Sequence, residues 1–162
     1  MEEEFVDIIT KNQGIIHKVC CIYCDDEEDR KDLFQEVVVQ LWRSFPSFRN
    51  ESKFSTWMYR VAINTAITSF KRGKRLPQRQ SLPEQSIQIV DDVYDPETED
   101  KIKLLYQSVS KLSGIEKSII LLYLESKTYE EIAEITGITQ NYVRVKMNRV
   151  KKKLKKLMNI EE

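Results

Sequence analysis

Amide and guanidinium side chains gather near the C-terminus, at positions where they could hydrogen-bond to nucleic-acid bases. From 140 to 160 the chain has 8 basic residues and no acidic one. At about 100° per residue, a helix over this segment has one apolar side and an opposite polar side. Asn and Gln can make two hydrogen bonds to adenine, Arg two to guanine, and a solvent-facing Val can contact a thymine methyl group. The candidates for base or phosphate contact are Gln140, Asn141, Arg144, Val145, Asn148, Arg149 and Lys152.

The residues that must position this segment have the spacing of a helix-turn-helix. Ala133 is a small residue that allows a second helix to approach, and Gly137, four positions on, suits a turn with positive φ. Val143, six positions further, would pack back against the first helix. Thr128 is followed at the third position by Glu131, as in a capping box. This combination favours DNA binding over a helical hairpin that merely turns at a Gly.

A second group of residues suggests metal chemistry, and the rest of the sequence argues against catalysis. His17, Cys21 and Cys24 have the spacing of three zinc ligands on a helix. A fourth ligand would have to come from the same stretch of backbone, so we favour small thiols packed inside a helix bundle. The chain has a single His, no Ser/His/Asp set and no phosphate-binding Gly loop. We therefore expect neither an enzyme nor a bound metal or cofactor.

The elements around these residues are all predicted to be helices. The chain of 162 residues has only 4 Gly and 4 Pro, and apolar residues recur at helical spacing over 5–23, 33–45 and 55–75. The periodicity fails after position 76, where Pro77 and Pro83 occur, and returns at Pro96. We therefore predict an all-α fold with two small helical lobes joined by a flexible linker. The domain boundaries are 1–76, 77–95 and 96–162.

Charge and hydropathy limit the partners and the compartment. The net charge is zero, but residues 37–80 hold 9 basic residues against 1 acidic, and 111–162 hold 11 against 7. Two basic surfaces suggest a polyanion held at two places. The sequence contains no run of about 18 apolar residues that could insert into a membrane. The acidic N-terminus is unlike a signal peptide, and three closely spaced Cys suit a reducing compartment, so we expect a cytoplasmic protein.

Two motifs, with the expected linker between them, resemble a known family. Region 2 of bacterial RNA polymerase sigma factors, in their extracytoplasmic-function (ECF) group, is similar to Asp32-Leu33-Phe34-Gln35-Glu36-Val37 and to Phe54-Ser55-Thr56-Trp57-Met58-Tyr59-Arg60-Val61-Ala62-Ile63-Asn64. Region 4 of the same family is similar to Thr128-Tyr129-Glu130-Glu131-Ile132-Ala133-Glu134-Ile135 and the helix after it. The resemblance implies region 2 over 1–76 and region 4 over 96–162.

The resemblance implies a role for each matching residue. Four residues match the segment that docks on the clamp helices of the polymerase largest subunit, namely Asp32, Gln35, Glu36 and Trp42. Others match the parts that capture a flipped base of the −10 element and melt the duplex: Phe48, Arg49, Asn50, Lys53, Phe54, Trp57, Tyr59, Arg60, Asn64, Lys71 and Arg72. The seven candidate residues of segment 140–152 match the helix that reads the −35 element.

The implied partners are core RNA polymerase, through its clamp helices and flap, promoter DNA, and an anti-sigma factor that holds the protein inactive. Two alternatives stay open. Phe54 and Trp57 also fall on the apolar side of their helix, so a place in the core is as plausible as a contact with DNA. The second alternative is a different class of function, a helix-turn-helix regulator that binds DNA as a dimer without polymerase contacts.

Overall fold

The structure, a computed structural model, describes residues 2–48, 53–73 and 95–159, with side chains described up to Ser69 in the second of these stretches. The regular elements of this part of the chain are all helices, and it contains no strand, as the sequence predicts. The elements are α1 (Glu2–Tyr23), α2 (Glu27–Ser44), the short 3-10 turn η1 (Phe45–Ser47), α3 (Phe54–Gly73), α4 (Pro96–Val109), α5 (Gly114–Leu124), α6 (Tyr129–Thr136) and α7 (Gln140–Leu157).

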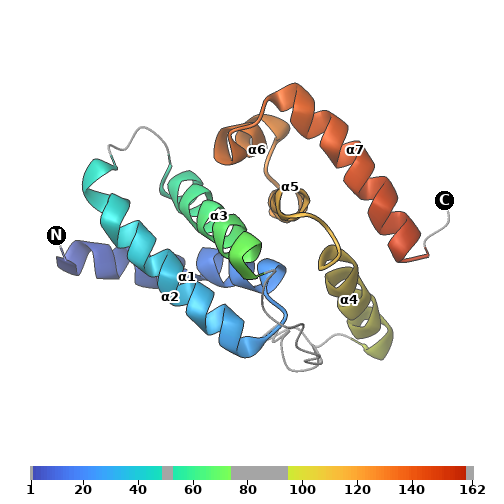
Figure 1. The fold of residues 1–162 in the computed structure, drawn as a ribbon, viewed down its shortest axis with the longest axis horizontal. Coiled ribbons are helices and arrows are strands. Elements are labelled where there is room, and N and C mark those ends of the chain that lie inside the picture. The colour runs from blue at the N-terminus through green and yellow to red at the C-terminus, as the bar shows by residue number, and fades with distance from the viewer. Residues whose placement is uncertain (1, 49–52, 74–94, 160–162) are drawn as a thin grey trace.

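Helices α1, α2 and α3 form the N-terminal lobe (Figure 1). The apolar residues of α3 occur on two sides, and α3 accordingly packs against both of the other helices. Met58 and Ile63 of α3 are fully or almost fully buried. Pro46 lies in η1, where α2 has already ended, because its ring and missing N–H cannot continue the helix. Helix α1 is bent at Asn12, whose side-chain amide donates to the Ile8 carbonyl at 2.8 Å.

Helices α4 to α7 form the C-terminal lobe, and each begins at a side-chain cap. Asp95 accepts from the Thr98 backbone N–H at 2.7 Å, with Pro at the first helical position. Complete capping boxes start α5 at Ser113 and α6 at Thr128. Thr139 accepts from the Tyr142 N–H at 3.1 Å at the start of α7. These local hydrogen bonds explain why the four helix starts are visible in the sequence.

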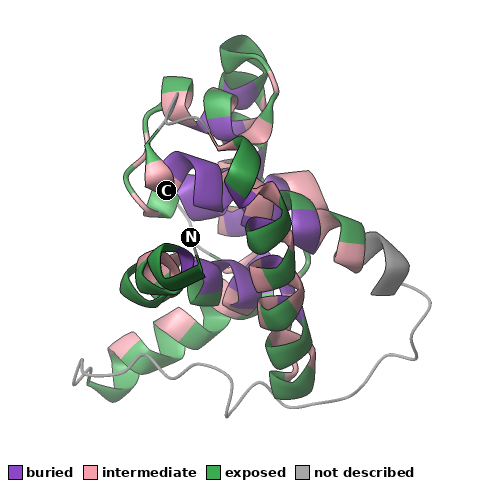
Figure 2. Cartoon of the chain, turned by 90° about the vertical axis from the view of Figure 1, so that its left-hand side faces the viewer, coloured by how far each residue is buried: buried purple, intermediate pink, exposed green. Residues whose placement is uncertain are grey.

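The two lobes are in contact along α1 and α3 on one side and α5 and α6 on the other. Buried side chains of both lobes belong to one apolar cluster. Figure 2 shows buried stretches of the ribbon, in purple, in both lobes. The expected linker, 77–95, lies outside the described residues except for Asp95, which caps α4. In the part of the chain that the structure describes, no helix is long and apolar enough to cross a membrane.

Candidate nucleic-acid interface

Helices α6 and α7 form the helix-turn-helix that the spacing predicts. Gly137 has φ +82°, a left-handed conformation that residues with a Cβ adopt only with strain. Its N–H donates to the Ala133 carbonyl at 2.9 Å and closes α6. Val143 is fully buried, and Ile132 is buried beside it in the core. The turn therefore fixes α7 across α6 by its buried side and leaves the other side of α7 open to a ligand.

The exposed side of α7 carries every residue expected to read DNA there. Along the same helix Val143, Met147 and Val150 are completely buried, which fixes its rotation about its own axis. Tyr142 is also exposed, and its ring lies 5.8 Å from the Lys146 ammonium group. Sequence reasoning missed Tyr142, although its place between Asn141 and Val143 near the helix start was a usable signal. The residues that are exposed as expected are Gln140, Asn141, Arg144, Val145, Asn148, Arg149 and Lys152.

Two lysines near the end of α7 hold the helix on α5. Lys153 Nζ lies 3.3 Å from Glu116 Oε1, and Lys151 Nζ lies 4.4 Å from the centre of the Tyr123 ring. Desolvation acts to raise the pKa of the Glu116 carboxyl, but the Ser113 N–H and Lys153 outweigh it and keep that pKa below its ordinary value. Lys151 and Lys153 thus have structural partners as well as charge for a phosphate backbone.

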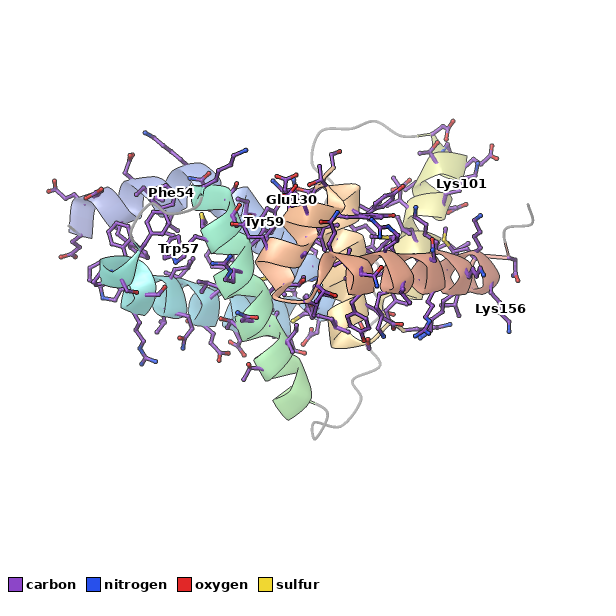
Figure 3. All side chains as sticks on the ribbon, turned by 90° about the horizontal axis from the view of Figure 1, so that it is seen from above. Phe54, Trp57, Tyr59, Lys101, Glu130 and Lys156 are labelled. Atoms are coloured by element: carbon purple, nitrogen blue, oxygen red, sulfur yellow. The ribbon has the colours of Figure 1, made fainter. Side chains whose placement is uncertain are left out.

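The N-terminal lobe contains an aromatic cluster at the start of α3. The ring centroids of Phe48 and Phe54 are 4.7 Å apart, and those of Phe48 and Trp57 are 4.9 Å apart. Trp57 is buried, whereas Phe48 and Phe54 are partly exposed. Figure 3 labels Phe54 and Trp57, which both belong to the first turn of α3. Trp57 therefore has a structural place in this cluster, and the two Phe rings offer partly open faces for stacking. Lys53 is exposed, Arg49 and Asn50 lie outside the described residues, and the side chains of Lys71 and Arg72 are not described.

Further along α3, two residues expected to hold the DNA strand contact the C-terminal lobe. Tyr59 is only 3% exposed, and its hydroxyl donates to Glu125 Oε1 at 3.0 Å. Burial, followed by the charge of Glu125, raises the pKa of the Tyr59 hydroxyl. Arg60 donates through Nη2 to the Glu134 carbonyl in α6 at 3.0 Å. Asn64, one turn on, is exposed. No pattern in the sequence indicates that Tyr59 and Arg60 have partners in the other lobe.

The candidate polymerase-docking residues lie on the exposed side of α2. Asp32 and Gln35 are exposed and Glu36 is partly buried. Trp42 is 42% exposed, and its ring packs edge-on against Phe5 of α1 with 5.0 Å between centroids. Val39 is also exposed, and its place seven residues after Asp32 puts it on the same side of the helix. The α2 face thus combines acidic and amide groups with two apolar side chains, of which the sequence pattern had identified only the Trp.

The residues with zinc-ligand spacing lie at the end of α1 and just after it, with His17 exposed and Cys21 and Cys24 partly buried. The His17 ring lies 4.7 Å from the Phe34 ring of α2, and Cys20 is buried. Burial raises the pKa of the Cys20 and Cys24 thiols to about 12, and raises that of Cys21 as well. Among the described residues, no group of three or more His, Cys, Asp or Glu side chains is placed to hold a metal ion. Cys20 is a small apolar member of the core, and Cys24 packs against that core.

Comparison with known families agrees with both lobes. The model of sigma-70 region 2 matches residues 8–76, and that of sigma-70 region 4 matches residues 102–154. The ECF RNA polymerase sigma-E factor of Haemophilus influenzae is 31% identical over 134 residues, which cover 76% of this chain and 71% of that protein. The ECF RNA polymerase sigma factor SigW of Bacillus subtilis is 25% identical over 166 residues, covering 96% of this chain and 89% of the relative.

Two solved structures share the fold over both lobes. The structure of CnrH in complex with the cytosolic domain of CnrY has a TM-score of 0.70 at 14% identity, covering 100% of this chain and 92% of that one. The sigma factor RpoE of Bartonella quintana, in complex with the anti-sigma factor NepR, has a TM-score of 0.68 at 17% identity, covering 99% and 98%. With region 2 and region 4 both matched, and a relative at 31% identity, the chain belongs to the sigma-70 family of RNA polymerase sigma factors, in its ECF group.

Proposed function

We propose that this sigma factor binds core RNA polymerase, recognises the −10 and −35 elements of promoters, melts the DNA and so directs transcription initiation in the cytoplasm. The observation that carries this proposal is the exposed side of α7, which brings all seven candidate reading residues to the surface. Such a face fits the major groove, where amide and guanidinium groups distinguish base pairs. The aromatic cluster of α3 and the exposed side of α2 supply the second DNA contact and the polymerase contact. A dimeric regulator without polymerase contacts is not favoured, because it would need no region 2.

Run-off transcription with core polymerase tests this function. Core polymerase from the native bacterium would be mixed with the chain and a library of promoter fragments from the same genome. We expect discrete transcripts that need both proteins, and their start sites would define the two promoter elements. Fragments that the chain binds tightly and alone, with no transcript when polymerase is added, would contradict the proposal and favour the dimeric regulator.

The docking part of the proposal can be tested by itself. The double substitution Trp42→Ala and Glu36→Lys should abolish co-purification with core polymerase, because it removes the exposed ring and reverses a charge on α2. Losing the ring contact with Phe5 should cost about 1 kcal/mol of stability, so thermal melting must show that the variant is still folded. The matched control is Leu104→Ala with Glu99→Lys, at exposed positions of α4 in the other lobe. Wild-type binding by the α2 variant would disprove the assignment.

We further propose that an anti-sigma factor binds this chain. The support is that the two solved structures named above are both complexes, and that one of them is a sigma factor bound to an anti-sigma factor. A candidate inhibitor should suppress run-off transcription by the reconstituted holoenzyme and should co-elute with the chain as a complex without polymerase. An inhibitor that suppresses transcription equally with a different sigma factor would act on the polymerase instead.

A further inference from the structure

A single carboxylate of the C-terminal lobe receives two hydrogen bonds from the N-terminal lobe. Glu125 Oε1 lies 2.6 Å from Lys18 Nζ of α1 and 3.0 Å from the Tyr59 hydroxyl of α3. Glu125 is the C-cap of α5, and the residue after it, Ser126, has φ +63°. The two donors thus converge from different helices on one oxygen atom that their own lobe does not provide.

The contact is part of a wider interface between the lobes, called the joint below, in which α5 and α6 cover part of α3. Lys127, two residues after Glu125, places its ammonium group 5.6 Å from the centre of the Tyr59 ring. The next residue of α3, Arg60, donates to the Glu134 carbonyl of α6. Tyr59 and Arg60 both belong to the set of residues that the resemblance assigns to strand holding. The C-terminal lobe therefore engages the part of α3 that a DNA strand would need.

The chemistry at this point suits an anionic oxygen. Here an ammonium group and a hydroxyl group both donate hydrogen bonds to the same oxygen atom. A phosphate oxygen accepts such hydrogen bonds as readily as a carboxylate oxygen does. Lys18 is half exposed and Glu125 keeps 23% side-chain exposure, so the pair lies at the edge of the joint and not in its dry centre. An exposed ion pair of this kind contributes little stability, and another anion can displace it.

We propose that Lys18 and Tyr59 form an anion site on the N-terminal lobe, which Glu125 fills while the lobes are in contact and which a backbone phosphate of single-stranded DNA fills when they separate. The proposal rests on the proposed function, since the ligand is the melted promoter strand. It adds Lys18 to the DNA-binding residues and makes Glu125 an internal competitor of the DNA. Strand binding and lobe contact then exclude each other at this site, and each weakens the other by the same factor.

Strand binding by the full chain tests the competition. The probe is a fluorescent single-stranded oligodeoxynucleotide of about 12 nucleotides and mixed sequence, followed by anisotropy. Glu125→Ala should bind it roughly 3- to 10-fold more tightly than the wild type, because the competing carboxylate is gone. Glu99→Ala is the matched control, since it removes one exposed carboxylate of α4 in the same lobe, away from the joint. Equal affinities of these two variants would overturn the proposal.

Two further measurements identify the site. Adding Lys18→Gln to Glu125→Ala should remove the gain in affinity, because the ammonium donor is lost. The gain should also vanish with a probe whose backbone is uncharged methylphosphonate. A gain that persists in the double variant, or with the uncharged probe, would show that the lobes compete elsewhere and would overturn the anion site. Run-off transcription separates this result from the proposed function: a chain that directs transcription but fails these tests has lost only the further inference.

Discussion

Burial determines the chemistry of individual side chains in this protein more than their type does. The Cys cluster at the end of α1 is an example, since its residue types suggest metal binding or redox reactivity. Burial raises the pKa of Cys20 and of Cys24 to about 12, with neighbouring thiols or carboxylates adding to it and Arg30 opposing it. The reactive thiolate form is therefore scarce at neutral pH.

Thiol labelling checks that burial keeps these thiols protonated in the folded chain. At pH 8 a maleimide should modify the folded chain at least about 10-fold more slowly than the chain in urea, because unfolding returns the thiols to their ordinary pKa near 8.5. The rate for the folded chain should rise steeply between pH 8 and pH 10, as more thiolate forms. Rapid labelling of the folded chain at neutral pH, at the rate seen in urea, would contradict the assigned burial.

The reading residues of α7 differ from its terminal lysines in what they should contribute. Arg149→Ala should weaken binding to the cognate −35 element by about 1–3 kcal/mol, and binding to unrelated duplex much less, because a lost base contact depends on sequence. Lys156→Ala, at an exposed position near the helix end, should weaken all duplexes alike and lower the salt slope by about one unit. Gel shifts at several salt concentrations distinguish the two. Equal losses for Arg149→Ala on both duplexes would make it a phosphate contact.

At the scale of elements, short-range hydrogen bonds decide where the helices of the C-terminal lobe begin and turn. The caps at Asp95, Ser113, Thr128 and Thr139 each involve residues three positions apart. The turn between α6 and α7 depends on one left-handed residue, Gly137. Its angle directs α7, and with it the whole reading face, across α6.

Substitution of this glycine measures what the turn requires. A Cβ at Gly137 would meet no atom within 4 Å, so Gly137→Ala should lose stability only through its backbone, by about 1–2 kcal/mol. Gly14→Ala is the matched control: it lies exposed within α1, also without a close neighbour, and should gain about 0.5–1 kcal/mol from helix propensity. Urea titrations of both variants give the two free energies. Stabilisation by Gly137→Ala would mean that the turn adopts another conformation in solution.

At the scale of the whole molecule, the two lobes form a joint that mixes buried and exposed contacts. Tyr23 donates to the Gly114 carbonyl at 2.6 Å, and Lys117 of α5 is almost completely buried above the Tyr23 ring. Desolvation lowers the pKa of Lys117, while Asp25 opposes that shift. The ion pair of Lys18 and Glu125 lies in the exposed part of the joint, as does the hydrogen bond from Arg60 to the Glu134 carbonyl. Salt should act on this exposed pair and hardly on the buried contacts.

Small-angle X-ray scattering can show how salt affects the exposed and the buried contacts between the lobes. We expect a compact profile at about 0.05 M salt and a modest increase in the radius of gyration at about 0.5 M, where exposed ion pairs are screened but buried contacts remain. Opposite charges in different parts of the chain favour the compact form at low salt. A fully extended profile at low salt would contradict both the joint and the electrostatic argument for it.

The sequence alone determined the all-α class, the helix starts of the C-terminal lobe, the helix-turn-helix and the rotation of α7. Caps and turns act within three or four residues, and the 3.6-residue period shows the buried side of a helix directly. The helix end at Pro46 and the turn at Gly137 could likewise be predicted, because the backbone constraints of Pro and Gly do not depend on the rest of the fold. The reading residues of α7 were identified correctly as exposed for the same reason.

Only the tertiary structure decided which element packs against each apolar or polar side of a helix. Trp57 was open between core and DNA until its packing against Phe48 was known, and the hydrogen-bond partner of Tyr59 lies 66 residues away in the other lobe. Periodicity shows that a side chain is covered but not which element covers it, because that depends on how separate helices meet. The contact at Glu125 depends on how the two lobes meet. A polar residue at a helix end is expected to face solvent, but here the approach of the N-terminal lobe gives the Glu125 carboxylate two hydrogen-bond donors.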